Sequence, residues 1–214
     1  MNTFFLDRLN SEPHALAFAG QSTPWPVALA DQSANPALDE ALHTHAAAAQ
    51  ALLYPVSAEL LATTGRPVDL FGFEPNPARL GAAAAASASV PGIALTQLGA
   101  LLDAAALGYN PAQAKPVAVL GHSQGVLAVH MVQAICEAGS IDAAAAKIDE
   151  ILAIATLIGV AGTRQARQLG LAARHGEATP MLSVKDITRA QVDALIERVD
   201  GARGPIAVAV TNSA

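Results

Sequence analysis

The sequence predicts an α/β fold. Two short apolar runs, residues 14–19 and 117–120, have the length and composition of buried strands. Each run ends in a turn that contains glycine, and the longer segments between and after the runs carry apolar residues at helical spacing. The 214 residues are 52% hydrophobic, which is enough to fill a sizeable core. Much of this content is alanine, so the helices are expected to pack closely.

Helices are expected around these strands, and several of their ends carry capping signals. They cover residues 1–13, 35–64, 92–107, 126–136, 142–168 and 188–199. Asn35 before Pro36 is typical of a helix start, whereas Pro55 must break or restart the same helix. Gly139 is expected to end the fourth helix, and Thr188 is expected to cap the last.

Two loops interrupt this pattern. Residues 20–25 form a polar turn with glycine and proline at the carboxyl end of the first strand. Ligands of α/β sheets bind beyond such strand ends, so this turn either faces the same crevice as the motif described next or is an ordinary loop. Residues 66–91 have no regular pattern, and the alanine run within them is either helical or a flexible loop.

The strongest chemical signal is the segment from Gly121 to Gly125, which matches the pattern G-x-S-x-G between an expected strand and an expected helix. Such a turn forces unusual backbone angles on Ser123, and the flanking glycines let the strand and the helix approach each other. The serine then lies at a helix N-terminus, where backbone N–H groups and the helix dipole can stabilise an oxyanion. Ser123 is therefore the predicted nucleophile. The alternative is a chance match in a chain rich in glycine and alanine.

Composition and charge argue against several other classes of function. The net charge of −6 and the absence of a basic cluster argue against a nucleic-acid partner. No signal peptide is evident and the apolar stretches are interrupted, so we expect no membrane span and a cytoplasmic location. The single cysteine, Cys136, excludes an internal disulfide and is expected to be a packing residue. His43 and His45 do not share a helix face and no glycine-rich nucleotide loop stands out, so we expect neither a metal nor a bound cofactor.

The end of the sequence predicts a second, smaller domain. After a polar linker at 172–179, residues 181–186 and 206–211 are expected to form strands on either side of the last helix. This β–α–β unit is half of a split βαβ domain. We therefore expect a large domain over 1–178 and a truncated small domain over 179–214, with the polypeptide continuing beyond it.

Six segments together carry a family resemblance. They are residues 14–21 (HALAFAGQ), 89–97 (SVPGIALTQ), 121–129 (GHSQGVLAV), 157–162 (LIGVAG), 180–193 (PMLSVKDITRAQVD) and 208–213 (VAVTNS). In this order, and over nearly the whole chain, they resemble the acetyltransferase domain of type I fatty acid synthases of the bacterial and fungal kind.

The resemblance implies a fold and a reaction. The fold is an α/β-hydrolase-like core that carries a ferredoxin-like small subdomain, with the active site in the cleft between them. In the reaction, a serine attacks the thioester of acetyl-CoA, and the phosphopantetheine thiol of acyl carrier protein takes the acyl group from the acyl-enzyme. Acetyl-CoA is thus a substrate. Other fatty acid synthase domains and further copies of the chain are the remaining implied partners.

The resemblance also assigns residues. It implies Ser123 as the nucleophile and the backbone N–H groups of Gln21 and Gln124 as the oxyanion hole, and it places Asn212 near the acyl pocket. The general-base histidine of the family lies beyond the part of the domain seen here, so no histidine of this chain matches it. His122 lies at the substrate pocket, but its side chain is expected to point away from the hydroxyl. Because a serine without its base is poorly activated, the chain alone is expected to be nearly inactive.

Two departures from malonyl-specific relatives predict the acyl preference. Those relatives carry an arginine where the alignment places Ile158, and a glutamate where this chain has Val126. An apolar wall leaves a carboxylate unpaired, so acetyl or a short unbranched acyl group is expected over malonyl. Arg164 and Arg167 reach the site only if the helix register differs, and otherwise lie at a solvated helix end.

Other functions stay open on sequence grounds. The serine turn is also compatible with a transferase for malonyl or another acyl group, or with a serine esterase of the α/β-hydrolase type. A third alternative is a structural segment of a synthase that has no activity by itself.

Overall fold

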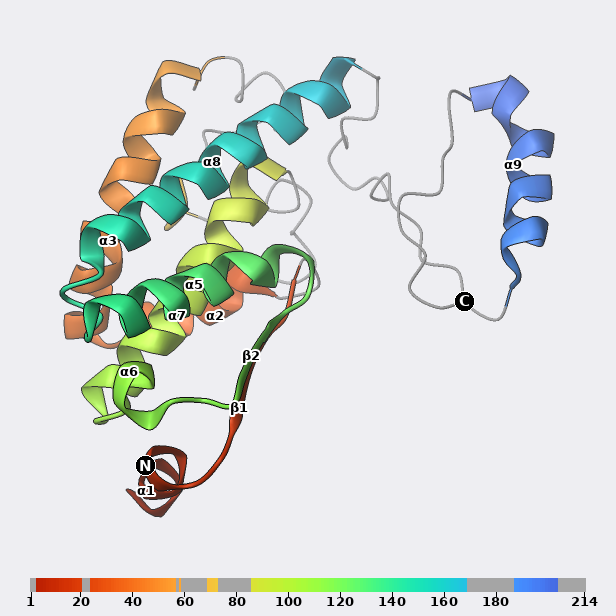
Figure 1. Ribbon diagram of the computed structural model, residues 1–214. Helices are drawn as coiled ribbons and strands as arrows, with labels where there is room; N and C mark the ends of the chain where they lie inside the picture. The colour runs from red at the N-terminus through yellow and green to blue at the C-terminus, as the bar shows by residue number, and fades with distance from the viewer. Residues whose placement is uncertain are drawn as a thin grey trace. The chain divides into compact units, whose positions relative to one another are not determined.

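The computed structural model describes residues 3–20, 24–56, 58, 69–72, 86–168 and 187–203 (Figure 1). The chain separates into two compact units, Met1–Pro180 and Met181–Ala214. In the larger unit, helices surround the long helix α5, and a short parallel sheet precedes the turn that carries Ser123. The described part of the smaller unit contains the helix α9.

The elements of the larger unit are, in chain order, α1 (Thr3–Ser11), β1 (Ala15–Phe18), α2 (Trp25–Ser33), α3 (Pro36–Leu53), the 3-10 turn η1 (Tyr54–Val56), α5 (Ala86–Ala106), α6 (Pro111–Ala114), β2 (Ala118–Gly121), the 3-10 turn η3 (Ser123–Gly125), α7 (Val126–Ala138) and α8 (Ala145–Gln168). Helix α9 spans Arg189–Arg203. Both predicted strands of the larger unit and the predicted N-terminal helix are thereby confirmed.

The predicted capping signals are also confirmed. The side chain of Asn35 accepts a hydrogen bond from the N–H two residues later at 3.2 Å, and Pro55 lies in the 3-10 turn that follows α3. Gly139 ends α7 with a φ of 88°, in the left-handed region that glycine adopts without cost. At the start of α9, the N–H of Thr188 donates to Gln191 Oε1 at 2.9 Å, and the N–H of Gln191 donates to Thr188 Oγ1 at 3.3 Å. This is a reciprocal capping box.

Two helix starts differ from the prediction. Helix α2 was not predicted, because the prolines on either side of Trp25 are typical of a turn. Proline also suits the first turn of a helix, and Trp25 is 3% exposed, so burial of its ring holds this segment in the helix. Helix α8 begins at Ala145 rather than at Asp142, after a turn over 141–144.

Helix α5 also begins earlier than predicted, at Ala86 rather than at Gly92, and contains Pro91. Proline lacks the N–H that a helix needs and clashes with the preceding turn. Every residue from 87 to 99 is nevertheless buried. Packing along this continuous surface therefore outweighs the cost of the proline, and the segment that sequence reasoning treats as irregular is helical from residue 86 onward.

Several other predictions fall on residues outside the described ranges. They concern the end of the helix expected to reach residue 64, most of the segment 66–85, the linker at 172–179 and the strands at 181–186 and 206–211. The α/β-hydrolase-like core and the half ferredoxin-like domain therefore stay predictions.

The two described strands run parallel and bring distant parts of the chain together. In the register of the sheet, Phe18 at the end of β1 lies opposite Gly121 at the end of β2. Leu16 and Val119 pack against the hydrophobic core. The pairing continues beyond the strands, because the N–H of His122 donates to the Phe18 carbonyl at 3.0 Å. The carboxyl end of β1 is thereby held beside the turn that follows β2.

Helix α5 lies at the centre of the larger unit, and helices α2, α3, α7 and α8 pack on it (Figure 1). Glycines bring these helices close. A Cβ atom at Gly92 of α5 would lie 2.5 Å from the ring of Trp25, and one at Gly159 of α8 would lie 2.4 Å from the Ala86 carbonyl oxygen. The α5 and α8 helices thus approach to backbone contact, and the Trp25 ring of α2 packs directly on the α5 backbone, at the density of an ordinary protein interior.

Helix α5 is also long and apolar enough to cross a membrane, judged by its length and composition, and 72% of the relevant window is buried inside the protein. Burial in the core accounts for this composition, because the core helix of a globular domain must be apolar on every side that it buries. By itself, the apolar character of α5 is weak evidence for a membrane.

The contact between α5 and α8 predicts the effect of one added methyl group. Gly159→Ala places a Cβ atom 2.4 Å from a backbone oxygen of α5, so the two helices must move apart. We expect the free energy of unfolding to fall by about 1–3 kcal/mol, measured by urea denaturation.

The matched control is Gly162→Ala on the same helix, whose Cβ would lie 3.2 Å from the Ala86 Cβ. The helix propensity gained by alanine, up to about 1 kcal/mol, offsets this milder contact. Equal destabilisation by both substitutions would contradict the close-packing argument.

Candidate active site

Ser123 lies in a sharp turn between β2 and α7. Its φ is 55°, a left-handed value that among the described residues other than glycine is shared with Lys115. This conformation costs roughly 1–2 kcal/mol for a residue with a Cβ atom. The side chain is exposed. The strand–turn–helix context predicted from the sequence is confirmed, and the strain at Ser123 is the kind that is retained where a side chain must be presented for chemistry.

Close contacts leave no room for a side chain at either glycine of the motif. A Cβ atom at Gly121 would lie 2.6 Å from the backbone of Gly125 and from the Val126 nitrogen. A Cβ atom at Gly125 would lie 2.3 Å from the Phe18 carbonyl oxygen. The two ends of the turn therefore pack against each other and against the end of β1. A side chain at either glycine position would force them apart.

Gly20, which follows β1, lies directly against the serine. A Cβ atom at Gly20 would lie 2.7 Å from the His122 carbonyl oxygen, 2.8 Å from Ser123 Cβ and 3.4 Å from the Gln124 nitrogen. The sequence leaves open whether the turn after β1 faces the serine, and the structure places Gly20 there. Gln21 lies outside the described residues, so the role of its N–H in an oxyanion hole stays a prediction.

Neutral dipoles surround the hydroxyl. Ser123 begins a 3-10 turn that leads directly into the 13-residue helix α7. A helix N-terminus carries a partial positive charge of about +0.5, which favours negative charge that develops nearby. The side-chain oxygen of Gln124, Oε1, is buried without a hydrogen-bond partner. The backbone nitrogen of Gln124 directly follows Ser123 and would lie 3.4 Å from a Cβ atom at Gly20, so it is a candidate donor to an oxyanion formed at Ser123.

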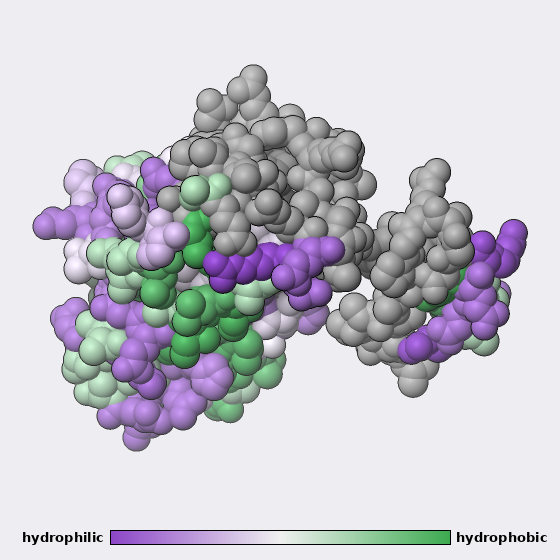
Figure 2. Space-filling model, turned by 90° about the horizontal axis from the view of Figure 1, so that it is seen from above, coloured by the Kyte–Doolittle hydropathy of each residue, from purple (hydrophilic) through white to green (hydrophobic). Residues whose placement is uncertain are grey.

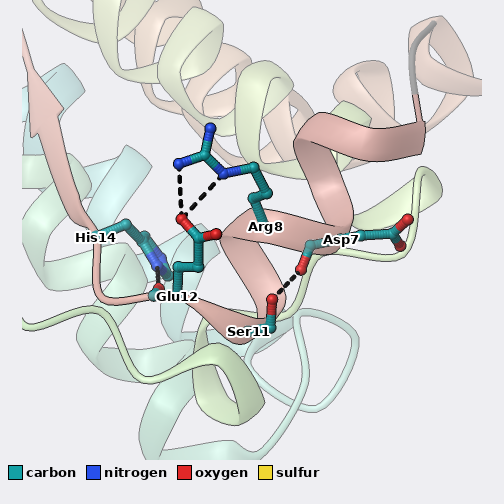
Figure 3. A network of polar contacts seen from close by, with 5 residues as sticks. All are labelled: Asp7, Arg8, Ser11, Glu12 and His14. Carbon is teal, nitrogen blue, oxygen red and sulfur yellow. Dashed lines mark hydrogen bonds and ion pairs between the residues drawn. The ribbon is translucent and has the colours of Figure 1, made fainter.

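His14 is committed to structural contacts. Its Nδ1 lies 3.0 Å from the Glu12 carbonyl oxygen, and its Nε2 lies 2.8 Å from the hydroxyl oxygen of Tyr109. Figure 3 shows the first of these contacts beside the ion pair of Arg8 with Glu12 at the end of α1. With both ring nitrogens occupied, His14 has no nitrogen available to accept a proton from a serine.

The other described histidines also make no hydrogen bond to Ser123. His45 Nδ1 pairs with Asp149 across α3 and α8 at 2.7 Å, and His43 stacks on Phe71 with 3.7 Å between ring centroids. His130 is exposed on α7, and His122 is exposed beside the serine. His175 lies outside the described residues. The described part of the chain therefore places His122 next to Ser123 and supplies no histidine that is bonded to its hydroxyl.

The remaining predicted pocket residues lie on α8 or beyond the described ranges. Ile158 is 52% exposed on α8, and Val160 is the nearest buried hydrophobic residue that follows it. Helix α8 has its main contacts with α3, α5 and α7. Contact of Ile158 with an acyl group therefore stays a prediction. Arg164 is exposed near the end of the helix, and Asn212 lies outside the described residues.

Apolar side chains are exposed on the larger unit. Figure 2 shows such residues beside strongly polar ones on one face of it. On α8, the neighbours Ile154 and Leu157 are 51% and 55% exposed. Val126, the first residue of α7, is 46% exposed and follows the serine turn directly. The serine turn is thus followed by an accessible apolar residue, and contact of Val126 with an acyl group stays a prediction.

Cys136 does not compete with Ser123 as a nucleophile. It is exposed rather than packed, which corrects the prediction from the sequence. Partial burial of the sulfur, and then the charge of Glu137, raise the pKa of its thiol. A raised pKa leaves less of the reactive thiolate at neutral pH. Among the described residues, no cluster of three histidine, cysteine, aspartate or glutamate side chains is suited to hold a metal ion.

Comparison with known families gives one match. Residues 74–213, which are more than half of the chain and include the serine turn, match the family model described as SAT, starter unit:ACP transacylase in aflatoxin biosynthesis. No curated protein sequence matches the chain. The match supports an acyltransferase that works with an acyl carrier protein in a synthase-type enzyme, and it does not single out the fatty acid synthases.

The strained backbone at Ser123 predicts a difference between two inactive variants. Glycine adopts a positive φ without cost, whereas alanine keeps the Cβ atom that makes it unfavourable. We expect Ser123→Gly to exceed Ser123→Ala in free energy of unfolding by about 1 kcal/mol, measured by urea denaturation.

The same comparison at Lys115 serves as the control, because its φ of 49° is also left-handed and Lys115 has no role in the candidate site. The free energy of unfolding of Lys115→Gly should exceed that of Lys115→Ala by a similar amount. If Ser123→Ala were as stable as Ser123→Gly, the serine would not be held in a strained conformation.

Proposed function

Because the chain belongs to the starter unit:ACP transacylase family, an acyltransferase family that serves acyl carrier protein, we propose that Ser123 takes an acetyl group from acetyl-CoA and passes it to the phosphopantetheine thiol of that carrier. The observation that carries the proposal is the positive φ of Ser123 in its glycine-flanked turn. We further propose an α/β-hydrolase-like core and a role in priming fatty acid synthesis, within a homo-oligomeric, cytoplasmic fatty acid synthase.

The proposed reaction has two steps through one covalent intermediate. The Ser123 oxygen attacks the thioester carbonyl, its proton passes to a general base, and the carbon–sulfur bond breaks to release CoA as its thiol after proton return. The carrier thiol then attacks the seryl ester, and the ester carbon–oxygen bond breaks. The serine recovers its proton, and the acyl group leaves as a thioester of the carrier protein.

Stabilisation of the tetrahedral intermediate is assigned to backbone dipoles. The Gln124 nitrogen and the N-terminal end of α7 follow Ser123 directly, and Gly20 lies against Ser123 from β1. Loss of one oxyanion donor typically costs about 10²–10³ in kcat. The stabilisation of the oxyanion is therefore large enough to decide whether Ser123 forms the acyl-enzyme at a useful rate.

The general base is proposed to be a histidine that is not among those of this chain, as the family resemblance implies. The described histidines support this assignment, because His14, His43 and His45 have structural contacts and none is hydrogen-bonded to the Ser123 hydroxyl. His122 is adjacent in sequence, but its backbone forms part of the turn itself: its N–H bonds to Phe18 and its carbonyl to the N–H of Gly125. A positioned base contributes about 10²–10⁴ in rate, so its absence would leave the chain nearly inactive.

The proposed preference for acetyl rests on the apolar character of the residues nearest the acyl group. Val126 follows the serine turn and is exposed, and Ile158 stands where malonyl-specific relatives place an arginine. A malonyl carboxylate in such surroundings loses water without gaining a cation, at a cost of several kcal/mol. An acetyl methyl group has no such cost.

The transfer itself is tested with the full-length protein and radiolabelled acetyl-CoA. We expect label on Ser123 in the absence of carrier protein, and its passage to the carrier thiol when carrier is added. Ser123→Ala should lose all protein-bound label.

The same assay separates a transferase from an esterase, since an esterase would release free acetate faster than it acetylates the carrier. Label that persists in Ser123→Ala would refute the nucleophile assignment.

The acyl preference is tested by returning a cation to α8. Ile158→Arg should raise the ratio of malonyl to acetyl transfer by about tenfold or more, because a bidentate guanidinium pairs with the carboxylate. The measurement is kcat/KM for malonyl-CoA and for acetyl-CoA with the full-length protein.

Ile154→Arg is the matched control, because Ile154 lies one turn earlier on α8 and is equally exposed, at 51% against 52%. It should leave the ratio unchanged. An equal response of both variants would attribute the effect to surface charge and not to the acyl pocket.

A further inference from the structure

Gln97 reaches from the central helix to the end of the strand beside the serine. Its Nε2 donates a hydrogen bond to the Ala19 carbonyl oxygen at 2.6 Å. Gln97 is 8% exposed, and its hydrogen bond to the carbonyl of the exposed residue Ala19 is partly buried. The hydrogen bond connects positions 78 residues apart in the chain, and it is short for an amide donor and a carbonyl acceptor.

The carbonyl that Gln97 holds belongs to the backbone that touches the serine turn. A Cβ atom at Gly125 would lie 3.0 Å from the Ala19 oxygen, so this oxygen lies under the turn. The next residue, Gly20, lies against Ser123 and close to the Gln124 nitrogen. A shift of the Ala19 peptide would therefore move the backbone that faces the serine hydroxyl.

The orientation of the Gln97 amide is fixed by its surroundings. If the amide were turned over, Oε1 would face the Ala19 oxygen and two acceptors would meet. In the orientation observed, Oε1 is buried without a hydrogen-bond partner. A buried polar atom without a hydrogen-bond partner costs about 1–3 kcal/mol of stability. An apolar side chain of similar size would not carry this cost. The donor of Gln97 is thus retained at a cost that core packing alone does not explain.

We propose that Gln97 is a positioning residue for acyl transfer: by holding the Ala19 carbonyl, it keeps Gly20 in place against Ser123 and close to the Gln124 nitrogen, where an oxyanion would be stabilised. The inference rests on the proposed function, in which Ser123 forms the acyl-enzyme. It concerns a residue that touches neither the substrate nor the reacting oxygen.

The expected effect lies in the chemical step. A displacement of about 1 Å in a positioned group can lower a rate by about 100-fold. Gln97→Met removes the donor and keeps the length of the side chain. We expect kcat for acetyl transfer to fall by about 10- to 100-fold with little change in KM for acetyl-CoA, because an interaction that acts through the oxyanion is made in the transition state.

The chain offers a closely matched control in Gln32. Its Nε2 also donates to a backbone carbonyl, that of Thr96, at 2.9 Å, and its Oε1 is also buried without a partner. This hydrogen bond joins α2 to α5 and does not involve the serine turn. Gln32→Met therefore removes the same kind of interaction, and it should leave kcat within about twofold while lowering the thermal midpoint comparably.

The experiment compares Gln97→Met, Gln32→Met and Ser123→Ala in the full-length protein, with radiolabelled acetyl-CoA and the thermal midpoint of each variant. A fall in kcat confined to Gln97→Met supports the inference. Equal kcat in the two glutamine variants, with label dependent on Ser123, refutes the role of Gln97 but leaves the proposed function intact. Label that survives in Ser123→Ala refutes the proposed function itself, and with it the inference.

Discussion

The close approach of β1 to the turn at Ser123 is the constraint on which the candidate site depends. A Cβ atom at Gly20 would fall 2.8 Å from the Cβ of Ser123, and one at Gly125 would fall 2.3 Å from the Phe18 oxygen. These contacts are with backbone or with the first side-chain atom of the serine, so no rotation of a side chain relieves them. The serine keeps its strained conformation because the parallel pairing of the strands holds the chain on both sides of it.

Two short strands do not hold such a turn by themselves, and the support comes from the helices. Helix α5 is buried over most of its length and contacts both α7 and the 3-10 turn of Ser123. Glycines at its crossings bring the backbone of α8 and the Trp25 ring of α2 into close contact with it. From this rigid centre Gln97 extends to the Ala19 carbonyl. The side-chain amide of Gln97 thus adds a connection from the core to the serine, beside the direct contact of α5 with the turn.

The features that could be predicted from the sequence are those whose signals are local. The glycines around Ser123 stand at fixed spacing between a strand and a helix, and Gly139 ends its helix through its own backbone. Pro91 favours a helix start after it, yet it lies inside α5, because burial between helices distant in sequence decides the conformation there. Gly20 is unremarkable in sequence for the same reason: its importance is a contact with a residue about a hundred positions later, which no local pattern encodes.

The charges around Ser123 are the physical basis of the proposed preference for a neutral acyl group. No lysine or arginine is present among the described residues that form the turn and its contacts, namely Gly20, Gly121, His122, Gln124, Gly125 and Val126. A carboxylate bound there would lose its hydration without a partner. An oxyanion differs, because it exists only in the transition state and meets backbone dipoles that are already oriented. Oriented dipoles without a fixed cation therefore stabilise the transition state of thioester attack more than they stabilise a bound anion, and this difference is what the proposed acyl transfer requires.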